Sequence, residues 1–334
     1  MRPTVVLAMV PLFTSELFTA EDFARLEAIA DVPEREPLTV FGDDRAAVLL
    51  ARADVLLTGW GCPALDGAML ARAPRLRAVV HAAGTVKLHI TDACWERRLQ
   101  VSSAAAANAV PVAEYTLAAI LLANKRAFRL QRRYRELREF RLWPAEAPGL
   151  GNYRKTIGIV GASQVGRRVL ELLRPFDFEV LLHDPYVTPA NTAALGARWT
   201  ELDALLAAAD VVSLHAPALP ETHALLDRRR LALMRDGAIL INTARGWLVD
   251  GDALTAELVS GRLDAVLDTT EPEILPADSP LYDLPNVFLT PHIAGALGRE
   301  TERLGNHAVA EIERFARGEP FQYPVRPEEL ARLA

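Results

Sequence analysis

The sequence predicts an α/β protein with two units, each built around a parallel sheet. At 334 residues, the chain is longer than one ordinary hydrophobic core supports. Short β-branched runs alternate with longer helical patterns almost throughout, which is typical of βαβ units. Glycines follow several of these runs directly, as tight turns require.

Composition indicates a globular protein and argues against several kinds of partner. Hydrophobic residues make up 51% of the chain and charged residues 24%, a balance without sign of disorder. The net charge of -6 gives no reason to expect nucleic acid or an anionic membrane as a partner. Cys62 and Cys94 are too few for a disulfide framework, and nothing near them has metal-ligand spacing. We expect reduced thiols in a cytoplasmic protein and no metal site.

The N-terminal part contains four runs that are predicted to be buried strands. They lie near residues 4–10, 54–58, 77–82 and 99–102. Pro11 interrupts the first run and acidic residues follow it, so this run is predicted to be a strand rather than a signal peptide. No apolar run approaches the roughly 18 residues that span a bilayer, which predicts a soluble protein.

A change in composition near residue 104 marks the start of a second unit. An alanine- and leucine-rich helix is predicted to run to about Leu122, and basic residues with interleaved glutamates follow between 125 and 141. An unbalanced basic run would indicate a nucleic-acid arm, so this segment is instead predicted to be a solvated or subunit-contacting helix. A loop is then predicted around Pro144, Pro148, Gly149 and Gly151.

Six further strands with helices between them predict one doubly wound parallel sheet. These strands lie near residues 157–161, 179–183, 211–214, 238–242, 263–267 and 287–290. The chain closes with a helix near 299–317 and a proline-containing tail. Because this tail has no pattern of a domain of its own, we expect it to pack back on the N-terminal unit.

The first strand of the second unit leads into a nucleotide-binding turn, Gly161-Ala162-Ser163-Gln164-Val165-Gly166. This is the dinucleotide fingerprint with its second glycine replaced by Ser163. Gly161 permits the tight turn and Gly166 the close packing of helix on strand. The N–H groups that begin the helix, at Ser163, Gln164 and Val165, are placed to bind a pyrophosphate.

An acidic residue then completes the nucleotide pattern. Asp184 ends the next strand, 18 residues after Gly166, and is placed to accept a hydrogen bond from the ribose 2′-hydroxyl. No arginine follows it to neutralise a 2′-phosphate, so the sequence favours NAD over NADP. The ends of later strands offer other cofactor contacts. These residues are His215, Ala216, Pro217, Thr243, Ala244 and Asp268.

Some of these residues also have a purely structural explanation. His215 can be explained equally well as an ordinary strand-end histidine or as a cofactor ligand. Asp268 either accepts a hydrogen bond from a carboxamide or caps its own strand end. Arg245, a carboxylate at 271–273 and His292 follow three apolar strands, where the active sites of parallel α/β sheets form. Together they can bind an anionic substrate and move one proton.

These motifs closely resemble the D-isomer-specific 2-hydroxyacid dehydrogenases over residues 78–307. The shared segments are Asn108-Ala109, Val112-Ala113-Glu114, 161–166, 215–217, 242–246, 267–273 and 290–295. The resemblance implies two Rossmann-like domains, with the NAD-binding domain at 105–292 inserted into a discontinuous, flavodoxin-like substrate domain made of 1–104 and 293–334. It also implies an active site in the cleft between the domains and a homodimer joined through the NAD-binding domain.

The resemblance further implies reversible hydride transfer between the nicotinamide and C2 of a 2-oxo acid. Arg245 would hold the substrate carboxylate and polarise the 2-oxo oxygen, with backbone N–H groups of Ala83, Gly84 and Thr85 on the other side. His292 would donate the proton, and Glu273 would orient its ring and favour its protonated form. Glu271 competes for this last role, but the family places its glutamate five residues after the aspartate, which matches Glu273.

The chain departs from the family pattern at Ser163, at Thr269 and Ile274 near Glu273, and in having one glycine where the loop at 82–85 usually has two. Two other functions fit the same motifs. One is an NADH-sensing binding protein like the C-terminal-binding corepressors, and the other is phosphite oxidation. Formate oxidation is disfavoured because the formate enzymes carry glutamine where Glu273 stands. Trp60 is either a pocket wall or core, and Lys87 either meets a second anionic group or is solvated.

Overall fold

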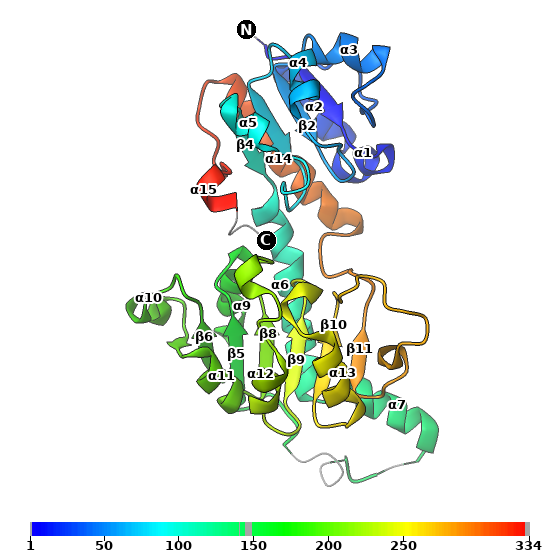
Figure 1. Cartoon of the computed structure of the whole chain (residues 1–334), viewed down its shortest axis with the longest axis vertical. Helices are drawn as coiled ribbons and strands as arrows, with labels where there is room; N and C mark the ends of the chain where they lie inside the picture. Colours follow the sequence, from blue (N-terminus) through cyan, green and yellow to red (C-terminus); the bar gives the residue numbers. More distant parts are fainter. Residues whose placement is uncertain (1, 140, 144–148, 331–334) are drawn as a thin grey trace. The chain divides into compact units, whose positions relative to one another are not determined.

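The computed structural model describes residues 2–139, 141–143 and 149–330 (Figure 1). The chain divides into two compact units. Unit 1 contains the residues up to Ala109 and those from Ala296 on, and unit 2 is Val110–Gly295. Each unit is a parallel sheet with helices, and one is discontinuous, so the predicted fold class is confirmed. The structure divides the chain at 109/110 and 295/296, where the sequence suggested 104/105 and 292/293.

The sheet of unit 1 has four parallel strands in the order β1-β2-β3-β4. They are β1 Val5–Ala8, β2 Val55–Thr58, β3 Ala78–His81 and β4 Gln100–Ser103. All their residues except Gln100 are buried, which explains their unbroken apolar runs. On the free edge of β1, Asp31 and Leu38 form parallel bridges to Thr4 and Ala8. Counting this edge segment, the strand order is the 2-1-3-4-5 of flavodoxin-like sheets.

Helices cover both faces of this sheet because alternate strand residues face opposite sides. Val5 and Leu7 pack with α1, α2 and α14, whereas Val6 and Ala8 pack with α3, α4 and α5. These helices are α1 Pro11–Leu17, α2 Ala20–Ile29, α14 Thr301–Ala316, α3 Asp44–Leu50, α4 Gly67–Arg72 and α5 Asp92–Glu96. A short α15, Pro327–Leu330, follows α14. The C-terminal helix thus belongs to the N-terminal unit, as the sequence predicts.

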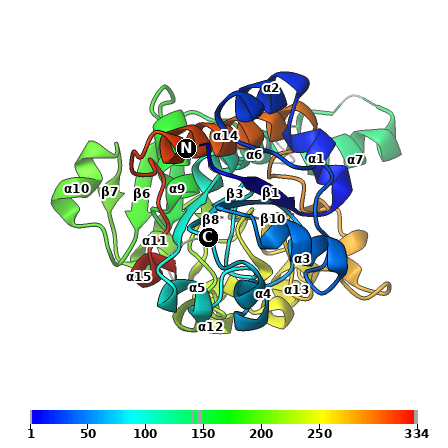
Figure 2. The ribbon, with the colours of Figure 1, turned by 90° about the horizontal axis from the view of Figure 1, so that it is seen from above.

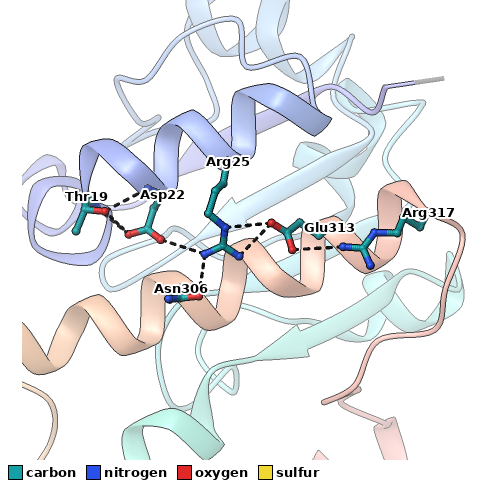
Figure 3. A network of polar contacts seen from close by, with 6 residues as sticks. All are labelled: Thr19, Asp22, Arg25, Asn306, Glu313 and Arg317. Carbon is teal, nitrogen blue, oxygen red and sulfur yellow. Dashed lines mark hydrogen bonds and ion pairs between the residues drawn. The ribbon is translucent and has the colours of Figure 1, made fainter.

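The helices α2 and α14 lie side by side (Figures 1 and 2) and are joined by a polar network (Figure 3). The guanidinium of Arg25 in α2 donates to Glu313 Oε1 at 3.0 Å and to Asn306 Oδ1 at 2.9 Å, both in α14. A Cβ atom added at Gly305 would lie 1.7 Å from the carbonyl oxygen of Leu17. Only glycine allows this approach, so Gly305 helps to unite segments from the two ends of the chain.

The sheet of unit 2 has seven parallel strands in the order β11-β10-β9-β8-β5-β6-β7. They are β5 Thr156–Val160, β6 Glu179–His183, β7 Arg198–Trp199, β8 Val211–Leu214, β9 Ile239–Asn242, β10 Asp264–Leu267 and β11 Val287–Leu289. The order is that of a dinucleotide-binding sheet extended by one strand. The six predicted strands are present. The sequence reading missed β7, which has only two residues and no apolar run.

Helices cover both faces of this sheet as well. The residues of α11, α12 and α13 share one apolar cluster, and those of α6 and α9 share the other. The helices of unit 2 include α6 Ala105–Asn124 (which begins in unit 1), α7 Ala127–Leu137, α9 Gln164–Leu173, α10 Pro189–Ala194, α11 Leu202–Ala208, α12 Arg228–Leu233 and α13 Gly251–Val259. Short 3₁₀ turns of unit 2 lie at η1 Pro220–Thr222, η2 Gly246–Leu248 and η3 Pro280–Tyr282, and η4 Gly298–Glu300 precedes α14 in unit 1.

One helix in the described part of the chain, α6, is long and apolar enough to cross a membrane. The expectation that no segment approaches that length is therefore wrong for α6. Ala113 and Ile120 of α6 are fully buried in the core of unit 2, and the same length and composition occur in core helices of soluble proteins. The predicted basic helix corresponds to α7. Of the predicted loop, Pro144 and Pro148 lie outside the described residues, and Gly149 and Gly151 have positive φ.

Candidate active site

The turn after β5 requires glycine at the two fingerprint positions that are glycine in this chain, 161 and 166. Gly161 has φ 100°, and a Cβ atom added there would lie 2.6 Å from the backbone nitrogen of Ala216. A Cβ atom added at Gly166 would lie 2.1 Å from the carbonyl oxygen of Gly161. The turn is therefore packed as tightly as the fingerprint implies, with β8 behind it.

Ser163, which replaces the second glycine, is the N-cap residue of helix α9. Its Oγ accepts a hydrogen bond from Gly166 N at 3.3 Å, which leaves its own hydroxyl proton available to a phosphate. In the first turn of a helix, N–H groups such as those of Gln164 and Val165 have no carbonyl partner within the helix. Helix α9 thus offers both N–H groups and a hydroxyl to an anion. The residues present fit a pyrophosphate.

Asp184 braces the same turn. Its carboxylate is 9% exposed and accepts hydrogen bonds from Ala162 N and from Tyr186 N, each at 2.7 Å. Each carboxylate oxygen has two acceptor positions, so a ribose hydroxyl can still donate to Asp184. Asp184 therefore makes two structural contacts and still has free acceptor positions.

His215 is part of the packing behind the turn. It is 2% exposed, its Nε2 contacts Ser213 Oγ at 2.9 Å, and its Cβ would lie 3.2 Å from a Cβ atom at Gly166. Burial lowers the pKa of His215 to about 3, so the ring is neutral. Its Nδ1 is buried and has no hydrogen-bond partner among the described residues. Such an orphaned atom beside a nucleotide turn is compatible with a missing ligand.

Arg245 follows β9 on a loop that Asn242 holds. The Asn242 side chain donates to the carbonyl oxygen of Arg245 at 2.8 Å and accepts from Ala244 N at 3.1 Å. A Cβ atom added at Gly246 would lie 2.0 Å from the carbonyl carbon of Thr270, so only glycine lets these two loops meet. Burial lowers the pKa of the half-buried Arg245 guanidinium, and the nearby charge of Glu273 opposes this shift. The sequence pattern Asn-x-x-Arg-Gly thus has a structural reason at each end.

Thr243, on the same loop, is tied to helix α6. Its Oγ1 lies 2.9 Å from Thr116 Oγ1, and the Thr116 hydroxyl also donates to the carbonyl oxygen of Val112. Because Thr116 uses its proton on Val112, the hydroxyl proton of Thr243 is the one that joins the two threonines. This contact fixes the position of the loop between Asn242 and Arg245.

Asp268, at the end of β10, organises the turn that carries His292. Its Oδ1 accepts from Thr290 Oγ1 at 2.6 Å and from Ile293 N at 2.8 Å, and its Oδ2 accepts from Ala294 N at 2.9 Å. Asp268 is 2% exposed. We call this set of contacts the Asp268 clasp. One acceptor position remains on Oδ2, where a carboxamide could donate.

His292 has a left-handed backbone with φ 54°, which costs a non-glycine residue on the order of 1 kcal/mol or more. The clasp offsets this cost, because His292 N also donates to the carbonyl oxygen of Asp268 at 3.0 Å. The ring Nδ1 lies 2.6 Å from Glu273 Oε1, and the two side chains are 46% and 54% exposed. An exposed histidine paired to a carboxylate is suited to exchanging a proton.

Glu273 is the carboxylate that meets His292. Its segment is held by Thr270, whose hydroxyl contacts the carbonyl oxygens of Pro272 and Glu273 at 2.8 and 3.1 Å. Glu271 lies on the stretch whose backbone packs against Gly246. A cavity of about 360 Å³ borders the pair, with Arg132 also in its wall.

In unit 1, the loop Ala83-Gly84-Thr85 follows β3. Ala83 is buried, and Gly84 and Thr85 are partly exposed. Thr85 Oγ1 accepts a hydrogen bond from Lys87 N at 3.3 Å. Trp60 is partly buried, and its ring lies 5.0 Å from that of Phe13, so it packs at the border of the unit 1 core.

Comparison with known proteins identifies the family. The profile of the D-isomer specific 2-hydroxyacid dehydrogenase NAD-binding domain matches residues 117–294. A D-3-phosphoglycerate dehydrogenase from Mycobacterium bovis is 36% identical over 83% of the chain and 52% of its own length. The chain belongs to the D-isomer specific 2-hydroxyacid dehydrogenase family. An (S)-sulfolactate dehydrogenase from Chromohalobacter salexigens is 36% identical over 88% of the chain and 96% of its own length.

A solved 2-hydroxyacid dehydrogenase agrees in fold. The D-lactate dehydrogenase from Aquifex aeolicus, complexed with NAD and lactic acid, aligns with a TM-score of 0.72 at 28% identity. That alignment covers 95% of this chain and 96% of the other. The chain spans about half the length of the mycobacterial phosphoglycerate dehydrogenases that it matches. The family match and this NAD complex support an NAD-type cofactor.

Some residues that shape the site have no sequence signal of their own. Tyr115 of α6 reaches the clasp, with its hydroxyl 2.8 Å from Thr290 Oγ1. The two residues are 175 positions apart, so only the folded sheet brings them together. Over the described residues, no three histidine, cysteine or acidic side chains gather as metal ligands. Cys62 and Cys94 are both free and buried.

Proposed function

We propose that the chain is an NAD-dependent oxidoreductase that interconverts a 2-oxo acid and a D-2-hydroxy acid. The observation that carries this proposal is the 2.6 Å contact between His292 Nδ1 and Glu273 Oε1, within electrostatic reach of Arg245. An always-charged guanidinium can bind a carboxylate, and a carboxylate-paired imidazole can exchange a proton. Apart from the redox step, reduction of a 2-oxo acid requires the protein to perform these two tasks.

The cofactor, when bound, supplies or accepts the hydride at C2 of the substrate. The α9 N-terminus with Ser163 would hold its pyrophosphate, and Asp184 would accept from the ribose hydroxyl. The carboxylate of Asp184 would repel a 2′-phosphate, which supports NAD over NADP. The remaining position of Asp268 Oδ2 would orient the carboxamide.

The substrate would be held by its carboxylate and its 2-oxo oxygen. Arg245 donates two hydrogen bonds in one plane and needs no protonation change at working pH. The backbone N–H groups of Ala83, Gly84 and Thr85 would bind the same carboxylate. Burial of the guanidinium strengthens its attraction for an anion, because water screens the interaction less.

His292 would transfer the proton. With Glu273 ionised, Nδ1 carries the hydrogen that points to Oε1, and Nε2 is the atom that faces the substrate. Nε2 donates its proton to the developing alkoxide during reduction and takes it back during oxidation. The carboxylate stabilises the imidazolium in the first case and fixes the ring orientation in both.

A substrate panel tests the proposal. Glyoxylate, hydroxypyruvate, pyruvate and bulkier 2-oxo acids are offered with NADH and with NADPH, and absorbance of the reduced cofactor is followed. We expect turnover with at least one acid and a preference for NADH. In His292→Gln, kcat should fall about 100-fold or more while the Kd of NADH is unchanged. Tight NADH binding without turnover of any acid would overturn the proposal and favour an NADH-sensing binding protein.

We also propose that the enzyme is cytoplasmic and a homodimer joined through unit 2. Phe128 of α7 stacks on Phe288 of the same unit, but none of the eleven residues of α7 is buried, and Tyr134 is 56% exposed. Exposed apolar side chains on a helix that is otherwise polar are typical of a subunit contact. Light scattering should give twice the chain mass for the native protein and the single chain mass for Leu130→Asp/Tyr134→Asp. A native mass of one chain would contradict the dimer.

A further inference from the structure

His81 is the last residue of β3 and stands directly before the loop Ala83-Gly84-Thr85. It is 1% exposed, and its register partner on the neighbouring strand is Thr58, the last residue of β2. The ring Nδ1 of His81 lies 2.8 Å from Thr58 Oγ1, in a fully buried contact. A polar side chain is thus buried at the base of the loop rather than exposed at the sheet edge.

The loop is anchored at both of its ends. At its start, Ala82 N donates to the carbonyl oxygen of Thr58 at 2.7 Å. At its end, the backbone of Thr85 contacts the His81 ring, and this contact raises the pKa of His81. A contact that favours the protonated ring comes from a hydrogen-bond acceptor, so the backbone atom is the carbonyl oxygen of Thr85. Since Nδ1 faces Thr58, the other ring nitrogen serves Thr85. Thr58 therefore holds both ends of the loop, one directly and the other through His81.

A neutral imidazole suits these two contacts. It has one N–H donor and one acceptor nitrogen, so Nε2 can donate to Thr85 while Nδ1 accepts from the Thr58 hydroxyl. Burial lowers the pKa of His81 to about 3, and the neighbouring His89, whose ring centroid is 5.0 Å away, lowers it further. Burial also lowers the pKa of His89. The ring therefore keeps the same donor and acceptor over the working pH range.

We propose that His81 is a positioning residue, which fixes the backbone of Ala83-Gly84-Thr85 so that its N–H groups meet the substrate carboxylate. This inference rests on the proposed function. His81 would not touch the substrate. It acts through Thr85, because a peptide group whose carbonyl is tied to the ring cannot turn freely, and three residues between two anchors have few other conformations.

Two isosteric substitutions separate the two contacts of the ring. The amide nitrogen of glutamine can occupy the place of Nε2 and still donate to Thr85, whereas asparagine reaches only the place of Nδ1 and Thr58. In His81→Asn, we expect the KM of the 2-oxo acid to rise about tenfold, as the loss of one buried hydrogen bond implies. In His81→Gln, it should stay within about threefold of the native value. In both, the Kd of NADH should be unchanged and kcat should move less than KM.

Matched controls show whether the effect belongs to the loop. His307→Asn and His307→Gln place the same changes on a partly buried histidine of α14 in the same unit and should leave KM unaltered. Thr58→Val removes the hydroxyl but not the Thr85 contact and should raise KM by about twofold to threefold. The melting temperature of each variant is measured alongside, and Thr58→Val decides the question if neither His81 variant folds.

The outcomes separate this inference from the proposed function. The positioning role would be overturned if folded His81→Asn had the native KM. It would also be overturned if KM rose equally in His81→Asn and His81→Gln and followed only the melting temperature. An unaltered KM in Thr58→Val would overturn it if that variant alone folds. In each of these cases, native turnover that His292→Gln abolishes would leave the proposed function standing. If the native enzyme reduces no 2-oxo acid, both proposals fall.

Discussion

His81 and His292 both lie at carboxyl ends of parallel strands, yet their surroundings are opposite. His81 is 1% exposed and contacts an uncharged hydroxyl, and burial holds its pKa near 3. The His292 side chain is 46% exposed and contacts a carboxylate. One ring is held in its neutral form by burial, and the other is open to solvent beside a carboxylate. The burial and the partner of a strand-end histidine therefore decide which of the two proposed roles it suits, positioning for His81 and proton transfer for His292.

The backbone next to the two rings is also held by different kinds of hydrogen bond, neutral at His81 and charged at His292. The loop after His81 is held at its start by neutral hydrogen bonds, from Ala82 N to the carbonyl oxygen of Thr58 and between His81 Nδ1 and Thr58 Oγ1. The turn of His292 is held by the buried carboxylate of Asp268, which accepts from three donors. A charged acceptor forms stronger hydrogen bonds than a neutral one, and the left-handed residue in this turn needs the stronger anchor. Substitutions in the Asp268 clasp should therefore cost more than those at His81.

The largest effect is expected from Asp268→Asn. An amide offers an acceptor on one side only, so its NH₂ group would face one of the three donors of the clasp. His292 would lose its fixed position, and kcat/KM should fall about 100-fold in steady-state assays. Asp54→Asn is the control, because Asp54 is another buried aspartate, and its carboxylate accepts from Thr4 N in unit 1. It should lower Tm and leave kcat/KM of the folded enzyme unchanged. Native activity in Asp268→Asn would refute the role of the clasp.

Glu273→Gln should have the next largest effect. Glutamine keeps an oxygen acceptor for the His292 ring but removes the charge, and a charge-assisted hydrogen bond is roughly twice as strong as a neutral one. We expect kcat/KM to fall about tenfold to thirtyfold, measured with the best acid of the panel. The neighbouring Glu271→Gln removes the same charge two positions away and should change kcat/KM by less than about twofold. Equal losses in the two variants would show that Glu271 shares the role.

Much of this arrangement follows from the sequence. Ten of the eleven strands are runs of apolar residues that the pattern of alternating strands and helices predicts, because strands of a covered parallel sheet are buried on both faces. The expected position of polar groups after β9, β10 and β11 follows from the same rule, since parallel strands end at one edge. The glycines at 161, 166 and 246 are predictable from motifs, and the structure shows the close contacts that demand them.

The rest depends on packing between distant segments. No local pattern indicates that Tyr115 reaches Thr290, or that the ring of His81 turns inward to Thr58 rather than outward. Likewise, Asp268 has the same sequence context whether it binds a ligand or clasps a turn. These features become visible only when the side chains are placed, because burial and hydrogen-bond partners are properties of the fold.

The buried histidines should also make folding sensitive to acid. The pKa of His81 and that of His215 are lowered to about 3, against an ordinary 6.5, so the unfolded chain binds these protons first as pH falls. Their contribution to stability is complete above about pH 6.5 and is lost between there and about pH 3, at about 1.4 kcal/mol per pH unit for each histidine. Urea unfolding at several pH values measures this slope, and His81→Gln should reduce it. An unchanged slope would mean that His81 is not the group that titrates.

The smallest effect is expected from Tyr115→Phe, which removes only the outermost contact of the clasp. The Thr290 hydroxyl donates to Asp268 Oδ1 at 2.6 Å, so the Tyr115 hydroxyl is the donor in its own contact with Thr290. Burial raises the pKa of Tyr115, which keeps this donor protonated. Without it, Thr290 still binds Asp268, so kcat/KM should fall only about twofold to threefold. Tyr153→Phe, at a tyrosine that is 67% exposed, should have no effect. A loss in Tyr115→Phe as large as that in Asp268→Asn would show that the clasp depends on α6 as much as on its own carboxylate.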